Sequence, residues 1–163
     1  MVTQEQLREL LDYDQETGIF TWKVRTTKSI HIGDVAGNVH ITSGYRRISI
    51  FGSLYYAHRL AWLYVYGKIP LVVIDHKNSV RDDNRIVNLR EANRSQNSAH
   101  RAPMGKSGFM GVCYHKRTGK WRAKIRKDHV ERYLGIFDAP EAAGAAYDSA
   151  AKVLHGEFAW SSC

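Results

Sequence analysis

The chain has 163 residues, enough for one large domain or a few small modules. It carries 24 lysines and arginines against 16 aspartates and glutamates, so its formal net charge is +8. An excess of this size indicates a polyanionic partner, with nucleic acid ahead of an anionic membrane. A hydrophobic content of 44% argues against a wholly disordered chain.

The composition and the first residues exclude several classes of protein. No apolar run approaches the ~18 residues that a membrane-spanning helix requires, and residues 1–5 lack the basic and apolar regions of a signal peptide. Cys113 and Cys163 are too few for a disulfide framework or a cysteine-based zinc site. We therefore expect an intracellular protein that is neither secreted nor anchored in a membrane.

The positive charge is concentrated toward the end of the chain. Residues 1–100 carry 13 basic and 10 acidic side chains, whereas residues 101–163 carry 11 and 6. Residues 101–108 contain proline, glycine and serine without apolar periodicity, which is typical of a linker. The sequence therefore predicts two parts that differ in charge density.

The first part predicts short helices and strands separated by glycine-containing turns. Leu7, Leu10 and Leu11 share one face of a helix that Thr3 can cap. Alternating apolar residues favour strands, and an apolar and aromatic run that stops at Gly67 favours a buried helix. The predicted elements are a helix at 3–12, strands at 19–24 and 45–50, a helix at 58–66 and a strand at 71–74.

The most informative segment begins where this last strand ends. The strand leads directly into Asp75 and His76, and a polar loop follows over residues 77–85. Asn88 comes after the loop, and Asn93 is a suitable N-cap for a helix from 94 to about 100. This helix carries Asn97 about one turn from its start, so the pattern is strand end, polar loop, asparagine, and a short helix with a second asparagine.

The segment from Tyr56 to Asn97 resembles the phage-type branch of the HNH nucleases, which are also called His-Me finger or ββα-metal nucleases. His76 and Asn88 are 12 residues apart, and Asn88 and Asn97 are 9 apart. The tripeptides Asp-Asn-Arg at 83–85 and Asn-Leu-Arg at 88–90 are also similar to that branch. Asn97 stands where many members have histidine, but several phage and intron-encoded members carry asparagine there.

The residue types in this motif suit metal-dependent hydrolysis of a phosphodiester. Mg²⁺ prefers oxygen ligands and usually takes one or two from the protein, and Asp75 and Asn97 offer such oxygens. Imidazole has an ordinary pKa of about 6.5, so His76 can act as a general base on water. Because neighbours in a strand face opposite sides, Asp75 and His76 can cooperate only if the strand ends in a bend.

The resemblance assigns His76 and Asn88 to the catalytic site, with Asn88 holding the loop that orients His76. It implies a single divalent ion on Asp75 and Asn97, with Mg²⁺ preferred and Mn²⁺ as the alternative. The implied reaction leaves a 5′ phosphate and a 3′ hydroxyl.

Other polar residues in this part have simpler interpretations. His58, inside the predicted helix, is interpreted as a packing histidine. His31 and His40 have no cysteine or third histidine nearby, so a structural zinc site is not expected. Four arginines could either contact phosphates or solvate the surface, and the sequence leaves this open: Arg81, Arg85, Arg90 and Arg94.

The second part predicts three strands followed by one helix. In Trp121–Lys127 apolar and cationic side chains alternate, so one face of the strand should be buried and the other positive. The other strands are predicted at 109–115 and 132–137. The helix is predicted over 139–155, with Asp138 as its cap, Pro140 in its first turn and Gly156 after its end. Its predicted inner stripe is Ala143, Ala146, Tyr147, Ala150 and Leu154.

This second part resembles an AP2/ERF-type DNA-binding domain, in which three antiparallel strands pack on one helix. The resemblance rests on five short motifs: Gly111-Val112, Gly119-Lys120-Trp121, Tyr133–Asp138, Glu141-Ala142-Ala143 and Ala145–Asp148. It implies a sheet laid in the major groove of DNA. Lys124, Arg126 and Tyr133 fall on the implied contacting face, and the strand alternation adds Arg122. Met110, Cys113 and His115 depart from the plant pattern, so its base preference does not transfer.

Together these patterns predict an α+β protein that acts on double-stranded DNA and not on membranes. The predicted regions are an N-terminal helix and β region at 1–55, a ββα-metal core at 56–100, a linker at 101–108 and an AP2/ERF-like domain at 109–160. A DNA endonuclease is favoured, inside a bacterial host if phage-encoded, over a non-catalytic sequence-specific DNA-binding regulator. The role of residues 1–55, the target site, nicking against double-strand cleavage, and monomer against dimer stay open.

Overall fold

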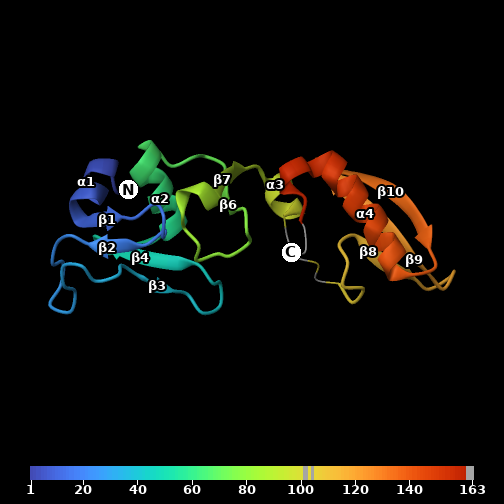
Figure 1. The fold of residues 1–163 in the computed structure, drawn as a ribbon, viewed down its shortest axis with the longest axis horizontal. Helices are drawn as coiled ribbons and strands as arrows, with labels where there is room; N and C mark the ends of the chain where they lie inside the picture. The colour runs from blue at the N-terminus through green and yellow to red at the C-terminus, as the bar shows by residue number, and fades with distance from the viewer. Residues whose placement is uncertain (101–102, 104, 161–163) are drawn as a thin grey trace. The chain divides into compact units, whose positions relative to one another are not determined.

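The computed structural model describes residues 1–100, 103 and 105–160, and it confirms the α+β fold class (Figure 1). The chain divides into two compact units, Met1–Glu91 and Ala92–Cys163. Part of the predicted linker at 101–108 lies outside the described residues, and the predicted domain limits stay predictions. Within the described part of the chain, no helix has the length and apolar character needed to cross a membrane.

The first unit begins with the predicted capped helix, which is shorter than expected. Thr3 accepts a hydrogen bond from the backbone of Gln6 while the Gln6 side chain accepts one from the backbone of Thr3, which confirms the cap. Helix α1 ends at Leu10 because Leu11 is extended and begins a strand. The elements of this unit are α1 (Gln4–Leu10), β1 (Leu11–Tyr13), β2 (Phe20–Trp22), β3 (Asn38–Val39), β4 (Arg46–Ile50), β5 (Ser53–Tyr56), α2 (Ala57–Tyr66), β6 (Val73–His76), the 3₁₀ helix η1 (Ile86–Asn88) and β7 (Leu89–Ala92).

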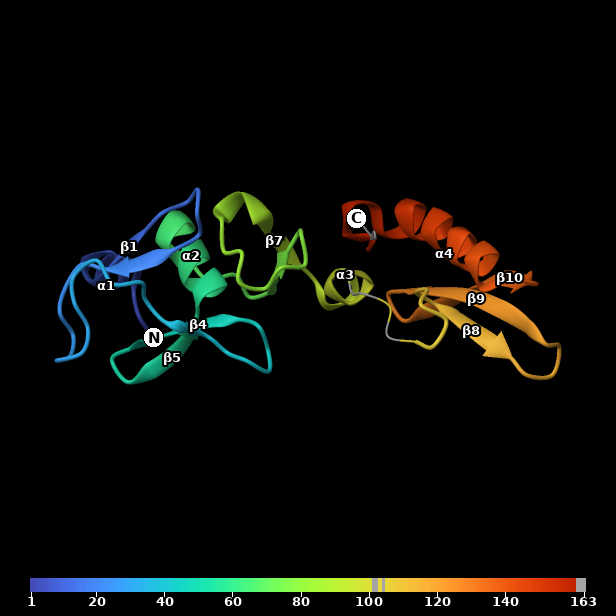
Figure 2. The same cartoon turned by 60° about the horizontal axis from the view of Figure 1, so that its bottom comes forward.

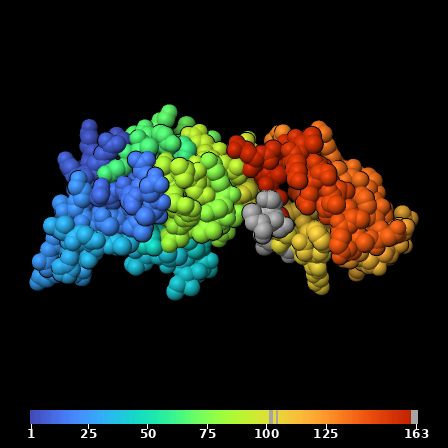
Figure 3. All heavy atoms as spheres, in the orientation of Figure 1, coloured from blue at the N-terminus to red at the C-terminus, as the bar shows by residue number. Residues whose placement is uncertain are grey.

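Three small sheets and one hydrophobic core hold the first unit together. β1 pairs with β2, β4 lies between β3 and β5, and β6 pairs with β7. Buried side chains from α1, β1, β2, β4, α2, β6 and β7 share the core. Residues 1–55 therefore pack against α2, and Figure 3 shows the blue and cyan N-terminal residues beside the green ones.

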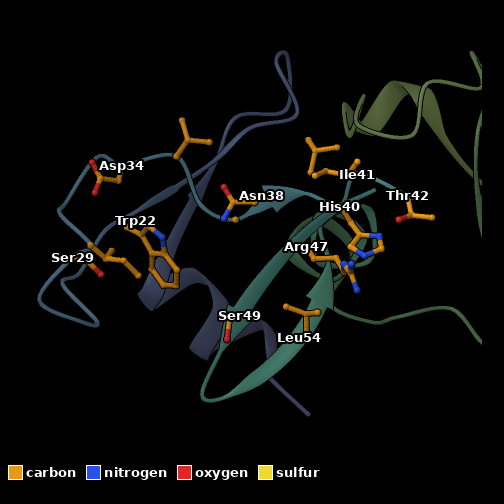
Figure 4. A pocket seen from close by; sticks show the side chains of 14 residues that line it. Trp22, Ser29, Asp34, Asn38, His40, Ile41, Thr42, Arg47, Ser49 and Leu54 are labelled. Atoms are coloured by element: carbon orange, nitrogen blue, oxygen red, sulfur yellow. The ribbon is translucent and has the colours of Figure 1, made fainter. Parts of the chain in front are cut away.

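A groove of about 940 Å³ lies over the sheet of β3, β4 and β5. Figure 4 shows Trp22 and Asp34 on one side of it and His40 and Arg47 on the other. Its lining mixes apolar and polar side chains. It is formed by residues other than the predicted catalytic ones.

The second unit contains the predicted three strands and helix. The strands form an antiparallel sheet with β9 in the middle, and α4 lies along one face of it (Figure 2). Ala123 and Ile125 of β9 are buried against α4, as the alternation predicted. The elements are α3 (Arg94–Ala99), β8 (Val112–His115), β9 (Lys120–Lys127), β10 (Val130–Phe137), α4 (Pro140–His155) and the 3₁₀ helix η2 (Gly156–Phe158).

Helix α4 corrects one detail of the prediction. Its N-cap is Ala139, without a side-chain hydrogen bond, whereas Asp138 was expected. The Asp138 carboxylate instead forms an ion pair with Lys120 at 2.8 Å. Pro140 occupies the first turn as predicted, and its fixed φ favours a helix start without a polar cap.

The inner face of α4 depends on a glycine. Ala143 and Tyr147 are buried as predicted, Ala146 is half-buried, and Gly144 is buried as well. A Cβ at Gly144 would overlap the ring of Phe109, which packs into the same core. The absence of a side chain at this position therefore sets how closely the chain before β8 approaches the helix.

Replacing this glycine should destabilise the second unit. Alanine is the better helix former by about 1 kcal/mol, but overpacking costs about 1–3 kcal/mol, so Gly144→Ala should lower the free energy of unfolding. Thermal unfolding of the full chain measures the change. Gly105→Ala is the matched control, because a Cβ there has only the Ser107 hydroxyl within 4 Å, at 3.8 Å. A Gly144→Ala protein at least as stable as Gly105→Ala would contradict this packing.

Candidate functional site

The end of β6 buries two polar side chains in succession. Asp75 is 7% exposed and His76 is 4% exposed, and apolar Ile74 precedes them in the core. The strand ends at His76, and a turn begins at the next residue. Asp75 and His76 contact different neighbours, as expected for consecutive residues of a strand.

Asp75 is held by an arginine on the paired strand. The Nε and Nη2 atoms of Arg90 in β7 both lie 2.9 Å from Oδ2 of Asp75. Arg90 is itself only 9% exposed, so the ion pair is buried. A buried carboxylate without a partner would be costly, and the ion pair with Arg90 offsets part of that cost. The predicted contact of Arg90 with phosphate stays a prediction, and it would require this ion pair to open.

His76 lies in a cluster of four rings, which we call the ring cluster: Tyr45, Tyr56, His58 and His76. The ring centroids of His58 and His76 are 5.1 Å apart, and the rings are nearly perpendicular at 79°. The ring centroid of Tyr45 lies 5.2 Å from that of His58 and 5.8 Å from that of His76. Tyr56 stacks on His58 with their ring centroids 5.5 Å apart. The ring of His58 therefore packs directly on the ring of the predicted general base.

The ring cluster leaves two buried nitrogen atoms unsatisfied. Among the described residues, Nδ1 of His58 and Nε2 of His76 have no hydrogen-bond partner. The sequence interpretation missed this relation, because residues 58 and 76 lie in different elements and no spacing rule connects them. The one signal was a histidine at the start of a mostly apolar and aromatic helix.

Burial sets the charge of both histidines. It lowers the pKa of His58 to about 3, and the nearby His76 acts in the same direction. Burial also lowers the pKa of His76, although Asn84, Asp75 and Asp83 oppose the change. Both rings are therefore neutral near pH 7, the form in which an imidazole can accept a proton.

Asn88 joins the two ends of the loop that follows β6. Its Oδ1 accepts a hydrogen bond from the Asn78 backbone at 3.1 Å. Its Nδ2 donates to Oδ1 of Asn78 at 3.0 Å and to the Asp83 carbonyl at 2.8 Å. Asn88 is 6% exposed, so these bonds are shielded from water. The contacts fit the loop-holding role that the resemblance implied, and its effect on catalysis stays a prediction.

The N-terminal region supports the same loop from outside. The Tyr13 hydroxyl donates to the Asn84 carbonyl at 2.6 Å, and Arg46 of β4 forms a bidentate ion pair with Asp82 at 2.9 and 3.0 Å. Gly18, at φ +75°, lies so close to the backbone of Asn84 and Arg85 that a Cβ would not fit. Residues 1–55 therefore help to shape the loop beside His76.

The remaining motif residues lie on α3. Asn93 caps this helix in a capping box with Gln96, which confirms the predicted cap, and Arg94 and Asn97 follow within it. Asn97 belongs to the second unit and Asp75 to the first, so their joint role as metal ligands stays a prediction. Their carboxylate and amide oxygens fit a hard ion such as Mg²⁺. In the part of the chain that the structure describes, no group of three or more His, Cys, Asp or Glu could hold a metal.

The outer face of the second unit's sheet carries the predicted cationic row. Arg122, Lys124 and Arg126 alternate along β9 with the buried Ala123 and Ile125. Arg122 donates a hydrogen bond to Sγ of Cys113 at 3.5 Å, and Lys124 forms an ion pair with Glu131 at 2.9 Å. Arg126 is exposed. Tyr133, which lies opposite Lys124 on β10, is 63% exposed. The row is a cationic surface, and its contact with DNA stays a prediction.

Arg85 belongs to the other predicted DNA-contacting set. Its guanidinium pairs with Asp83 at 2.6 Å, and the Arg85 side chain is 45% exposed. Hydrogen bonds from Arg85 lower the pKa of Asp83 to about 2. Arg85 therefore has a partner on its own loop while part of it faces solvent.

The buried His58 should make the protein less stable in acid. Its pKa is about 3 in the folded protein against 6.5 for an ordinary histidine. Below that ordinary pKa only the unfolded chain binds the proton, so the free energy of unfolding should fall by about 1.4 kcal/mol per pH unit until the folded pKa is reached. Urea unfolding of wild type and His58→Phe between about pH 7.5 and 4.5 measures this. As the pH falls, the free energy of unfolding should decrease more for wild type than for His58→Phe. If it decreases equally in both proteins, the low pKa of His58 is contradicted.

Comparisons with known proteins find two kinds of match, and the first crosses the boundary between the two units at residues 91 and 92. The family model described as HNH endonuclease matches residues 55–99, the stretch from the end of β5 to α3. The chain is 41% identical over 59 residues to the AP2-like ethylene-responsive transcription factor TOE2 of Arabidopsis thaliana, which is 36% of this chain and 12% of that protein. It is 48% identical over 58 residues to Ethylene-responsive transcription factor ERF084 of the same plant, which is 33% of this chain and 22% of that protein.

A rice relative gives a similar result. The chain is 40% identical over 57 residues to APETALA2-like protein 2 of Oryza sativa subsp. indica, covering 34% of this chain and 13% of that protein. The match thus spans only a minor part of each of these relatives. No solved structure matches the chain. The chain therefore combines a segment that matches the HNH endonuclease family with a stretch similar to AP2/ERF-type transcription factors.

Proposed function

We propose that this protein is a metal-dependent DNA endonuclease that an AP2-like module places on double-stranded DNA. The observation that carries the proposal is the buried end of β6. There Asp75 and a neutral His76 follow each other inside the segment that matches the HNH endonuclease family.

Each residue of the site has a defined task in this reaction. His76 accepts a proton from the water that attacks the phosphorus atom, because its ring is neutral near pH 7. Asp75 and Asn97 would hold Mg²⁺ or Mn²⁺, and Asn88 keeps the loop beside His76 in place. When bound, the ion supplies Lewis-acid stabilisation for the departing 3′ oxygen. The products are a 5′ phosphate and a 3′ hydroxyl.

The second unit would supply most of the DNA contacts. Its cationic row, Arg122, Lys124 and Arg126 with Tyr133, suits phosphate and base contacts in a groove. Arg85 and Arg94 would add contacts near the cleavage site, and Arg90 would do so only after leaving Asp75. The similarity to plant transcription factors supports an alternative function, a DNA-binding regulator without cleavage. The presence of Asp75, His76, Asn88 and Asn97 favours the nuclease.

Removing the general base should slow cleavage strongly and leave DNA binding intact. Plasmid incubated with the wild-type protein and Mg²⁺ or Mn²⁺ should be nicked or cut, and His76→Ala should be slower by about 100-fold or more. His31→Ala is the matched control, because His31 is an exposed histidine in the same unit. Gel-shift affinity should be equal for all three proteins. Equal cleavage by wild type and His76→Ala would refute the role of His76, and binding without any cleavage would favour the regulator.

Reversing one charge on the cationic row should weaken DNA binding and its salt dependence. Arg126→Glu removes a cation that would face phosphate, so the slope of log affinity against log salt should fall by about 1. Lys152→Glu changes the net charge equally but lies on an exposed position of α4. Gel shifts at several salt concentrations compare the two variants. Equal losses in both would mean that the sheet face is not the DNA-binding face.

A further inference from the structure

Two imidazole rings meet inside the ring cluster. His58, the second residue of α2, lies with its ring 5.1 Å from that of His76 and nearly perpendicular to it. His58 is 8% exposed and His76 is 4% exposed, and the rings of Tyr45 and Tyr56 pack against His58. His76 therefore has another histidine as a direct neighbour.

The nitrogen atoms of this pair need an explanation. Nδ1 of His58 and Nε2 of His76 are buried and have no hydrogen-bond partner among the described residues. A buried polar atom without a partner costs free energy, and native proteins keep few of them. Phenylalanine would fill nearly the same volume without that cost. Packing alone therefore does not account for a histidine at position 58.

The neighbouring His58 can provide His76 with a hydrogen-bond acceptor that sets its tautomer, which a general base requires. A neutral imidazole has one N–H and one bare nitrogen, and the partner of the N–H decides which nitrogen stays bare. A centroid separation of 5.1 Å allows a hydrogen bond between ring nitrogens once the rings turn edge to edge. Within the ring cluster, Nδ1 of His58 is a buried ring nitrogen without a partner, so it can accept this N–H in competition with the Asn84 side chain, which also interacts with His76.

We propose that His58 is a positioning residue for His76 that acts through its ring nitrogen and selects the His76 tautomer that accepts a proton from water. The inference rests on the proposed role of His76 as general base. His58 itself touches neither DNA nor the attacking water in this scheme. Its contribution is to fix the orientation and the tautomer of the neighbouring ring before the reaction begins.

The direct test is the nitrogen spectrum of His76 in the full-length protein without metal. Two-bond ¹H–¹⁵N correlation spectra distinguish the two neutral tautomers, and the loss of signals in His76→Ala assigns the ring. Wild type should show one tautomer of His76. His58→Phe, which keeps the ring volume, should show a mixture or the other tautomer, and His58→Gln, which keeps an acceptor, should largely restore the wild-type signal.

Cleavage gives a second, separate readout. With saturating DNA and Mg²⁺ or Mn²⁺, His58→Phe should lower the single-turnover rate by about tenfold or more, with DNA affinity unchanged. His58→Gln should recover a substantial part of the rate. Thermal unfolding checks that the variants are folded, and if one variant does not fold, the other still compares with wild type.

The outcomes separate this inference from the proposed function. An unchanged His76 spectrum and full cleavage in His58→Phe would overturn the positioning role and leave His58 as a packing residue. Equal effects of the Phe and Gln variants on the spectrum would also overturn it, because the ring nitrogen would then not matter. If wild type does not cleave DNA but the His76 spectrum changes in His58→Phe and not in His58→Gln, the nuclease proposal fails while the positioning of His76 stands.

Discussion

The burial of two polar residues at the end of β6 is the constraint on which the first unit depends. A carboxylate and an imidazole lose hydration there, so the surrounding chain must provide partners for them. Arg90 neutralises Asp75 across the β6–β7 pair, and the ring cluster encloses His76. These partners come from β7, α2 and the segment before β4, which are far apart in the sequence. The fold of the whole unit is therefore needed to hold two consecutive residues in place.

The N-terminal region takes part in this arrangement, although the sequence left its role open. Tyr13 and Gly18 contact the backbone of the loop at Asn84 and Arg85, and Arg46 of β4 pairs with Asp82 of the same loop. Asn88 closes the loop from inside. The segment that matches the HNH family is thus supported by residues outside the match. A fragment limited to residues 55–99 would lose these contacts and nine of the fifteen buried residues of this hydrophobic core.

The second unit meets a simpler requirement, because its sheet has one buried and one exposed face. Apolar and cationic residues alternate along β9, so burying Ala123 and Ile125 against α4 places Arg122, Lys124 and Arg126 on the outside. The close approach at Gly144 lets Phe109 join the core. The net charge of +5 on residues 101–163 therefore includes a row of three cationic side chains on the outer face of the sheet.

The sequence by itself determined the features that depend on neighbouring residues. The caps Thr3 and Asn93, the end of α2 at Gly67 and the alternation of β9 follow from local hydrogen bonds and side-chain periodicity, and the structure confirms them. The order and spacing of Asp75, His76, Asn88 and Asn97 can also be read from the sequence alone. Only the tertiary structure decided the short strand β7, the Asp75–Arg90 ion pair, the contact of His58 with His76, and the pairing of Asp138 with Lys120 in place of a helix cap. Each of these depends on a partner distant in the chain, and local pattern carries no information on which distant residues will meet.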